Sequence, residues 1–383
     1  MAKRPNKLLD KIIATSVARA RKDINQWRMA LQRAESVENP KRYLLYNIYN
    51  ELILDAHLSA EVQRRTLAVQ GASYNLVNEE GITDPEKTKL IKRPWFNDFL
   101  RYAMESVFWG HSLVQINDLV EGEVSGVTLI NRNHVIPEKG LFVFRQTDDK
   151  GIFYREDEKY WQWLLEIGNT NDLGLYNKCA PHVLYKRFAQ GAWSEFCEIF
   201  GMPVRYLKTN AKDDESLNRA ENMLKTMGSS FYGVLDTDEE LKFLETAKSD
   251  GGVYKGLMDV SNNEISKLIN GAVIGGESQG GSRSKEEVGE RLSESITDAD
   301  KQFIEHYVNH TLIPKLIALG YDLNGVSFQF EKSQDLKQLF TFTQGFMQTM
   351  DVDPEWVQDT FGIPVTPKAI LPTTQKDAGD FFG

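Results

Sequence analysis

The feature that most constrains the fold is an apolar stripe along residues 285–319. Its members recur at the spacing of one helix face: Val288, Leu292, Ile296, Ala299, Phe303, Tyr307, Leu312 and Leu316. A helix of this length spans roughly 50 Å, and Pro314 is expected to kink its last turns. A predicted strand and shorter helices follow it: 325–331, 333–350, 353–361 and 367–370. The sequence therefore predicts a fold organised around one long amphipathic helix.

A small module and a polar connection precede the long helix. We expect a helix over 181–200, which ends at Gly201-Met202-Pro203, and a second helix over 252–272. Between them lie an extended segment (203–209), a helix (213–227), a strand (231–236), and a strand or turn (240–246). The glycine-rich segment 275–284 joins the second helix to the long one. The predicted order is therefore helix, small α/β module, helix, polar loop and long helix.

The N-terminal part combines helices with short strands. Helical patterns cover four segments: 6–35, 42–56, 58–66 and 84–109. Asp84 and Pro85 are expected to start the last of these, Pro94 to divide it, and Gly110 to end it. Extended patterns bounded by turn residues cover the remainder: 67–77, 112–117, 125–131, 140–146, 151–155 and 160–166. These elements predict an α+β domain over about residues 40–175.

Composition excludes several classes of protein. Apolar residues make up 41% of the 383 residues and charged residues 26%, which is enough apolar material for buried cores and excludes a wholly disordered chain. We expect no membrane span, because no stretch approaches about 18 apolar residues. The basic N-terminus lacks the apolar region of a signal peptide. Cys179 and Cys197 are too few for a zinc site or a disulfide framework, and we expect them to be reduced and half-buried.

The charge balance argues against a chain that grips nucleic acid. The net charge is −10, whereas tight binding to the DNA backbone needs a basic face. An acidic or mixed surface suits DNA that must slide without sticking. The segment 3–22 is the exception, with seven basic residues and one acid. It is either a solvated helix face or a contact with an acidic partner surface or nucleic acid.

No catalytic, cofactor or metal motif stands out. The loop from Gly276 fails as a phosphate-binding P-loop, because Ser282 and Arg283 stand where lysine and serine or threonine are needed. His306 and His310 share a helix face but lack the inner glutamate and a third ligand of a metal site. The sequence also lacks the G-x-S-x-G motif of a nucleophilic serine. We therefore predict no catalytic residue, no cofactor and no metal, and a protein that is not an enzyme.

Several motifs together resemble one family. They include W-S-E-F-C-E-I-F-G-M-P-V-R over 193–205, E-I-S-K over 264–267 followed by Gly275-Gly276, and G-G-S-R over 280–283 with Glu287-Val288. Weaker ones are Asp300 within I-T-D-A-D and the segments 57–71, 102–110, 312–316, 354–357 and 361–364. This pattern resembles the portal proteins of tailed bacteriophages, specifically the Mu-like family. The loop and the C-terminal region are shorter than that family leads us to expect.

The resemblance implies a mostly helical α+β portal fold, assembled as a ring. The implied parts are an N-terminal helix and α/β wing (1–180), a first stem helix (181–202), a clip (203–250) and a second stem helix (251–273). A tunnel loop (274–284), a long wing helix with a strand (285–331), and a short crown with the tail (332–383) follow.

The resemblance also implies a function. Such a ring, usually of twelve subunits, sits in the virion at one vertex of the shell of major capsid protein. It is assembled in the cytoplasm of the bacterial host. Double-stranded DNA passes through it during packaging and ejection. The packaging motor, called terminase, and head-completion or neck adaptor proteins dock on it. No membrane is involved.

Two groups of residues are candidates for these contacts. The loop would face DNA through neutral donors and two cations: Ser278, Gln279, Ser282, Arg283 and Lys285. The clip would present an acidic edge to a basic partner: Asp236, Asp238, Glu239 and Glu240. Two other functions stay open: a nucleotide-dependent packaging motor or nuclease, and a ring-forming structural adaptor without DNA contact. The motor or nuclease would need a phosphate-binding lysine or a cluster of metal-binding carboxylates.

Overall fold

The computed structural model describes most of the chain. The described residues are 24–200, 205–208, 213–226, 232–235, 252–273, 283–331, 336–347, 350 and 352–364. The chain divides into two units, Met1–Phe330 and Glu331–Gly383. No helix among the described residues is both long and apolar enough to span a bilayer.

Three helices open the described chain: α1 (Ile24–Ala34), α2 (Tyr43–Leu52) and α3 (Ala56–Gln70). The Asp55 side chain caps α3 by accepting a hydrogen bond from the Leu58 amide. The prediction that 67–77 is extended is wrong for its first residues, because α3 continues to Gln70 and buries Val69 in the core. The strand β1 (Tyr74–Asn78) follows. The predicted helix 6–35 is confirmed over α1, and its earlier residues lie outside the described ranges.

The next two helices have the predicted ends. They are α4 (Pro85–Ile91) and α5 (Pro94–Trp109). Asp84 accepts hydrogen bonds from two amides of the first turn of α4. Gly110 ends α5 with a φ of 86°, in the left-handed region that glycine adopts without strain. The backbone at Asp172 also lies close to Gly110, because a Cβ at Gly110 would lie 2.2 Å from the Asp172 carbonyl oxygen.

Short strands and turns follow α5. They are β2 (His111–Ile116), β3 (Leu119–Val120), β4 (Glu123–Val124), β5 (Val127–Leu129), β6 (Val135–Ile136), β7 (Leu141–Val143), β8 (Gly151–Phe153), α6 (Glu158–Trp161) and β9 (Leu164–Gly168), with 3-10 turns at Arg132–His134 and Pro137–Lys139. Antiparallel pairing gives sheets β5-β2-β9 and β6-β7-β8 and the hairpin β3-β4. The predicted strand 160–166 starts only at Leu164. Asp157 instead caps the short helix α6.

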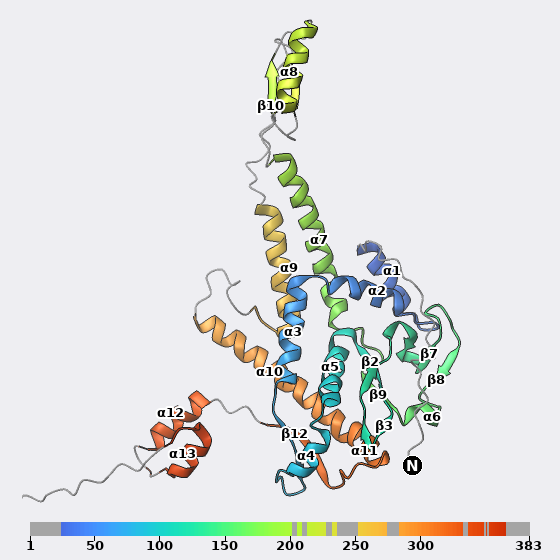
Figure 1. Ribbon diagram of the computed structural model, residues 1–383, viewed down its shortest axis with the longest axis vertical. Coiled ribbons are helices and arrows are strands. Elements are labelled where there is room, and N and C mark those ends of the chain that lie inside the picture. The colour runs from blue at the N-terminus through green and yellow to red at the C-terminus, as the bar shows by residue number, and fades with distance from the viewer. Residues whose placement is uncertain are drawn as a thin grey trace, which may run out of the picture. The chain divides into compact units, whose positions relative to one another are not determined.

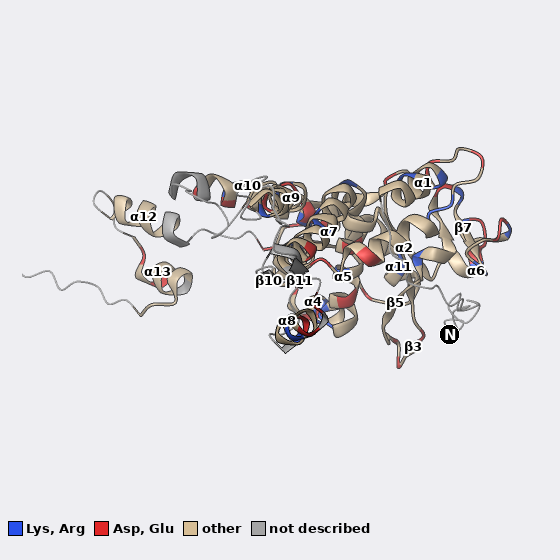
Figure 2. Ribbon diagram, turned by 90° about the horizontal axis from the view of Figure 1, so that it is seen from above, with Lys and Arg blue, Asp and Glu red and all other residues tan. Residues whose placement is uncertain are grey.

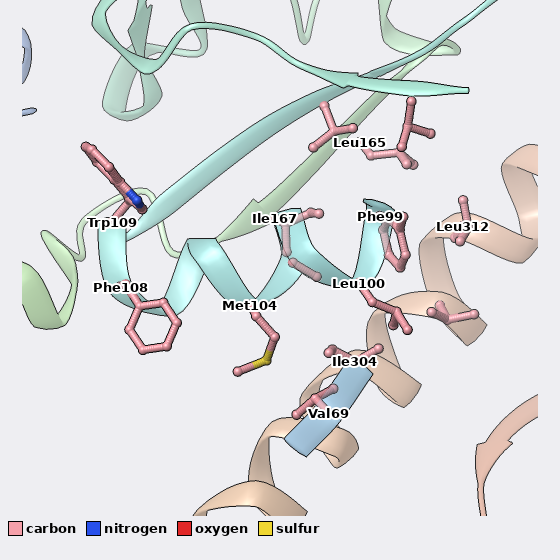
Figure 3. Packing of buried hydrophobic residues seen from close by; sticks show 14 of the residues in the cluster. Val69, Phe99, Leu100, Met104, Phe108, Trp109, Leu165, Ile167, Ile304 and Leu312 are labelled. Atoms are coloured by element: carbon pink, nitrogen blue, oxygen red, sulfur yellow. The ribbon is translucent and has the colours of Figure 1, made fainter. Parts of the chain in front are cut away.

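The main core forms where α5 meets the sheet and the long helix. Figure 3 shows Leu165 and Ile167 of β9, Met104 of α5, and Ile304 and Leu312 of the long helix gathered in one cluster. All five side chains are fully buried. This apolar contact holds the segments before and after the small module together.

Two helices side by side form a hairpin: α7 (Gly174–Phe200) and α9 (Gly252–Asn270) (Figure 1). The helix predicted over 181–200 starts earlier, at Gly174, so Pro181 lies inside it. Proline removes one helix hydrogen bond there. Tyr176, Cys179 and Val183 are buried on the same stretch, and this packing offsets the loss. The helix predicted over 252–272 is confirmed by α9.

The module between these helices is a βαβ unit. Its described elements are β10 (Arg205–Lys208), α8 (Asp214–Thr226) and β11 (Tyr232–Leu235), and the two strands are parallel. Its predicted extended segment, helix and strand are confirmed. The segment 240–246 lies outside the described residues.

The long helix is confirmed but is not uniform. It comprises α10 (Arg283–Tyr307), a π-helical turn (Val308–Leu312) and α11 (Ile313–Ala318). The π-helical turn lies just before Pro314, where the sequence predicts a kink. In a regular α-helix the proline ring would clash with the carbonyl four residues earlier, so the α-helical pattern is interrupted there.

The π-helical turn holds the last strand of the first unit, β12 (Val326–Phe330), which pairs antiparallel with β1. The Asn309 amide nitrogen donates to the Phe328 carbonyl at 2.9 Å. The Phe328 amide donates to Asn309 Oδ1 at 2.7 Å. One side chain therefore satisfies both backbone groups of a buried residue.

The second unit contains α12 (Leu336–Phe346) and α13 (Pro354–Phe361). Asp353 caps α13 by accepting from the Glu355 amide, and the Phe340 and Phe361 rings lie 5.9 Å apart. Both helices were predicted. The segment 367–370 lies outside the described residues.

Candidate functional site

A row of buried polar side chains lies at the base of the hairpin. His57, Glu61 and Arg65 are four residues apart on α3, so they share one face of that helix. Their side chains are only 12%, 9% and 10% exposed. Their partners come from the facing helices: Asn262, Ser266, Ile269 and Asn270 of α9, and Asp300 of α10. We call these eight residues the polar seam.

The upper part of the seam joins α3 to the middle of α9. His57 Nε2 lies 3.0 Å from the Asn262 backbone carbonyl and 2.8 Å from Ser266 Oγ. A carbonyl only accepts, so this nitrogen carries a hydrogen. Ser266 Oγ in turn donates to Glu61 Oε1 at 3.0 Å. The Glu61 carboxylate also accepts from Asn270 and Arg64, so a buried charge is fully bonded.

Arg65 forms the lower part and joins three helices. Its Nε and Nη2 donate to the two Asp300 carboxylate oxygens at 2.7 and 2.9 Å. Its Nη1 donates to the Ile269 carbonyl, in the last turn of α9, at 2.6 Å. Asp300 is buried in α10. A planar guanidinium with two parallel bonds to a carboxylate fixes orientation as well as distance.

The end of α9 also packs directly against α10. Gly271 follows the last residue of α9 with a φ of 77°, and its amide donates to the Lys267 carbonyl at 3.0 Å. A Cβ at Gly271 would lie 2.7 Å from Ile296 Cδ1 of α10. The position therefore requires glycine for both its backbone angle and its close contact.

A separate ion pair holds the other helix of the hairpin. Lys186 Nζ of α7 lies 3.0 and 2.9 Å from the two Asp55 carboxylate oxygens, and both side chains are buried. Beside it, Arg187 donates to the Glu51 carbonyl. The two hairpin helices are thus attached to α3 at different points by different charged groups.

The structure places only part of the predicted DNA-facing group. Arg283 is the first residue of α10 and Lys285 follows in its first turn, so Arg283 belongs to the helix and not to the predicted loop 274–284. The nearest strong helix breakers before it are Gly280 and Gly281, and no glycine or proline lies between Arg283 and Val288. Ser278, Gln279 and Ser282 lie outside the described residues.

The predicted acidic edge of the clip also lies outside the described residues. Asp236, Asp238, Glu239 and Glu240 come directly after β11, which ends at Leu235. Their role as a docking surface stays a prediction.

The histidine pair and the cysteines are also placed. The His306 and His310 rings lie 4.3 Å apart between centroids. Within the described ranges, no group of three or more His, Cys, Asp or Glu is arranged to hold a metal ion. Both cysteines are free, but neither is half-buried: Cys179 is buried and Cys197 is exposed. Burial raises the pKa of the Cys179 thiol to about 12, so it stays protonated.

A second buried charge cluster stiffens the sheet. The Glu166 carboxylate of β9 accepts from His111 at 2.9 Å, from Tyr154 at 2.7 Å and from Arg155 at 2.6 Å. Burial by itself would raise the pKa of Glu166. The hydrogen bonds from Arg155, His111 and Tyr154 outweigh it and lower this pKa to about 2. The cluster joins β2 to β9 and shares no residue with the polar seam.

Charge on the described elements is mixed. Figure 2 shows basic and acidic residues on many of the described elements. The expectation that the chain as a whole does not grip DNA stays a prediction.

The polar seam was not identified from the sequence. His57 looked like one of six scattered histidines, and the polar residues of α3 look like a solvated face. The available signal was the four-residue spacing of His57, Glu61 and Arg65, together with the family motifs that contain Ser266 and Asp300.

Comparison with known proteins identifies the family. The family model described as the portal protein of Mu bacteriophage matches residues 46–363. The portal protein of Escherichia phage Mu is 22% identical over 339 residues, which cover 81% of this chain and 65% of that protein. The Mu-like prophage FluMu protein gp29 of Haemophilus influenzae is 20% identical over 346 residues, with the same two coverages. The chain thus spans just under two thirds of these relatives.

A solved structure supports the fold. A chain in the virion of a native gene transfer agent particle superposes with a TM-score of 0.51 at 11% identity, over 90% of this chain and 100% of that one. The resemblance and the mostly helical α+β portal fold inferred from the sequence are both confirmed. Because the family model covers well over half of its length, this chain belongs to the portal protein family of bacteriophage Mu.

Proposed function

We propose that this chain is the subunit of a ring at one vertex of a phage capsid, through which double-stranded DNA passes during packaging and ejection. It acts as a conduit and makes or breaks no bond. Membership of the portal family over residues 46–363 is the observation that carries this proposal. The proposed ring has twelve subunits.

Apolar stripes that are exposed in the described part of the chain support assembly with copies of the same chain. On α9, Val253, Leu257 and Val260 follow helical spacing and are 76%, 42% and 58% exposed. On α10, Val288 and Leu292 are 56% and 48% exposed. A closed ring needs two different faces on each subunit, because each subunit meets its two neighbours through different surfaces. Two exposed stripes on two helices meet that need.

Charge supports a channel that does not hold DNA tightly. The net charge of −10 per chain disfavours adhesion to phosphates. Arg283 and Lys285 would recur once per subunit near the start of α10, as two basic rings in an acidic assembly. We propose that they contact DNA together with Ser278, Gln279 and Ser282.

The remaining partners are proposed from the family. They are the major capsid protein around the ring, terminase during packaging, and head-completion or neck adaptors afterwards. We propose that terminase or an adaptor docks on the acidic residues that follow β11: Asp236, Asp238, Glu239 and Glu240. The ring would be assembled in the host cytoplasm before it enters the virion.

The ring is tested by charge placed in the α9 stripe. A Val253→Asp/Val260→Asp variant should give mostly unassembled chains by mass photometry, while the parent gives rings with a central hole in electron micrographs. Val37→Asp is the matched control, because Val37 is 96% exposed and lies outside both stripes. Only monomers or dimers from the parent under varied salt and concentration would contradict the proposal, as would normal rings from the stripe variant.

The DNA contact is tested separately. Particles that carry Arg283→Ala/Lys285→Ala should assemble normally but package or retain less DNA than the parent. Parental DNA content in these particles would overturn the contact and leave the ring proposal standing.

A further inference from the structure

We propose that Arg65 is a positioning residue that sets the direction of the first turns of α10, and through them the contact with DNA. This inference rests on the proposed function, since it concerns where Arg283 and Lys285 are presented. Arg65 lies on α3 and acts only through α9 and α10.

Arg65 holds the two helices that flank residues 274–282. Its bond to the Ile269 carbonyl fixes the last turn of α9, and its two bonds to Asp300 fix the middle of α10. The Asp300 carboxylate binds one edge of the planar group, through Nε and Nη2, and the Ile269 carbonyl binds the third nitrogen, Nη1. A rotation of α10 relative to α9 would therefore break at least one of these bonds.

Neighbouring contacts make this arrangement specific. Glu61 holds Ser266 and Asn270 on the same face of α9, so the last two turns of that helix are attached to α3. Gly271 is in close contact with Ile296, four residues before Asp300. The end of α9 and the middle of α10 are thus held together from two sides, by hydrogen bonds and by packing.

The geometry amplifies small changes. Arg283 precedes Asp300 by 17 residues in one continuous helix, a distance of about 25 Å along the axis. A tilt of about 10° at Asp300 would move the start of α10 by about 4 Å. That is larger than a hydrogen-bond length, so loss of the Arg65 bonds would displace basic groups that contact phosphates.

Some of the first side chains of α10 that the structure describes are turned to solvent. Val288 and Leu292, on the turns that follow the start of α10, are 56% and 48% exposed. The Arg65–Asp300 pair is the charged contact nearest to them that joins α10 to both α3 and α9 in the part of the chain that the structure describes.

The test compares amide hydrogen exchange in assembled rings of the parent and three variants. Arg65→Lys keeps the charge but loses the forked geometry. Arg65→Met/Asp300→Leu replaces both charged side chains by apolar ones, in case the lysine variant folds poorly. Lys186→Met is the matched control, because it breaks another buried ion pair, which holds α7 and not α10.

We expect exchange to be at least tenfold faster in residues 270–273 and 283–295 of both Arg65 variants. Lys186→Met should speed exchange in α7 and leave these residues as in the parent. Equal changes in the control, or no local change in the Arg65 variants, would overturn the inference, because Arg65 would then be one stabilising residue among others.

DNA content of nuclease-treated particles provides the second measurement. Arg65 variants should assemble as many rings as the parent but hold several-fold less DNA. Parental DNA content despite faster exchange would overturn the link to DNA. If parent particles themselves take up no DNA, the proposed function fails. The exchange data would still decide whether Arg65 positions α10.

Discussion

The ion pair between α7 and α3 offers a direct measure of how firmly the hairpin is attached. Lys186→Met removes the cation but keeps a flexible apolar stem of similar length. Asp55 then keeps the hydrogen bond from the Leu58 amide but loses both contacts to Lys186. A buried carboxylate is left without a counter-charge.

The size of the effect follows from burial. The Lys186 and Asp55 side chains are only 7% and 5% exposed. Removing one partner of a buried ion pair costs about 3–5 kcal/mol of unfolding free energy. The remaining amide bond to Asp55 reduces the penalty, so we expect a loss of about 3 kcal/mol.

Urea unfolding followed by tryptophan fluorescence measures this loss as a shift of the midpoint at constant slope. Asp55→Asn keeps an acceptor for the α3 cap while removing the charge. The double variant Lys186→Met/Asp55→Asn should therefore recover at least half of the single loss. Lys89→Met is the control, since its pair with Glu86 is 68% and 83% exposed and should change stability by under about 0.5 kcal/mol.

Two results would refute the reasoning. Lys186→Met could match the Lys89→Met control, which would mean that the buried pair contributes nothing to stability. Alternatively, the double variant could lose as much as the sum of the two single variants, which would mean that the two groups do not interact.

Two further predictions concern other buried groups. The pKa of Glu166 is about 2 in the folded chain and 4.5 ordinarily, so its contribution to stability is complete above about pH 4.5 and is lost as the pH falls toward 2. The urea midpoint should fall over that window in the parent and fall less in Glu166→Gln. Asn309→Leu leaves the backbone N–H and carbonyl of buried Phe328 without partners and should cost about 2–5 kcal/mol in the same urea assay. Asn309→Asp, which still accepts from the N–H, should lose less.

The sequence alone determined the elements whose ends depend on neighbouring residues. Asp84 and Pro85 start α4, and Gly110 ends α5, where the sequence predicts them. These signals are local, because a cap or a left-handed glycine acts within one helical turn. The motifs at 193–205, 264–267 and 280–283, together with the order of helices around the small module, also carried the resemblance to the portal family.

Tertiary packing decided the elements that local rules misplaced. Pro181 predicts the first turn of a helix, yet buried Tyr176 and Cys179 extend α7 before it. Val69 extends α3 in the same way. In both cases burial of apolar side chains outweighs the local preference, and the surface that buries them is remote in sequence.

Only the tertiary structure decided the candidate site. His57, Glu61 and Arg65 face either water or polar partners. The choice depends on α9 and α10, which lie some 200 residues further along the chain and supply those partners. A polar side chain has the same local sequence pattern in either place. Its burial is tolerated only because distant partners satisfy every charge, and that pairing exists only in the folded chain.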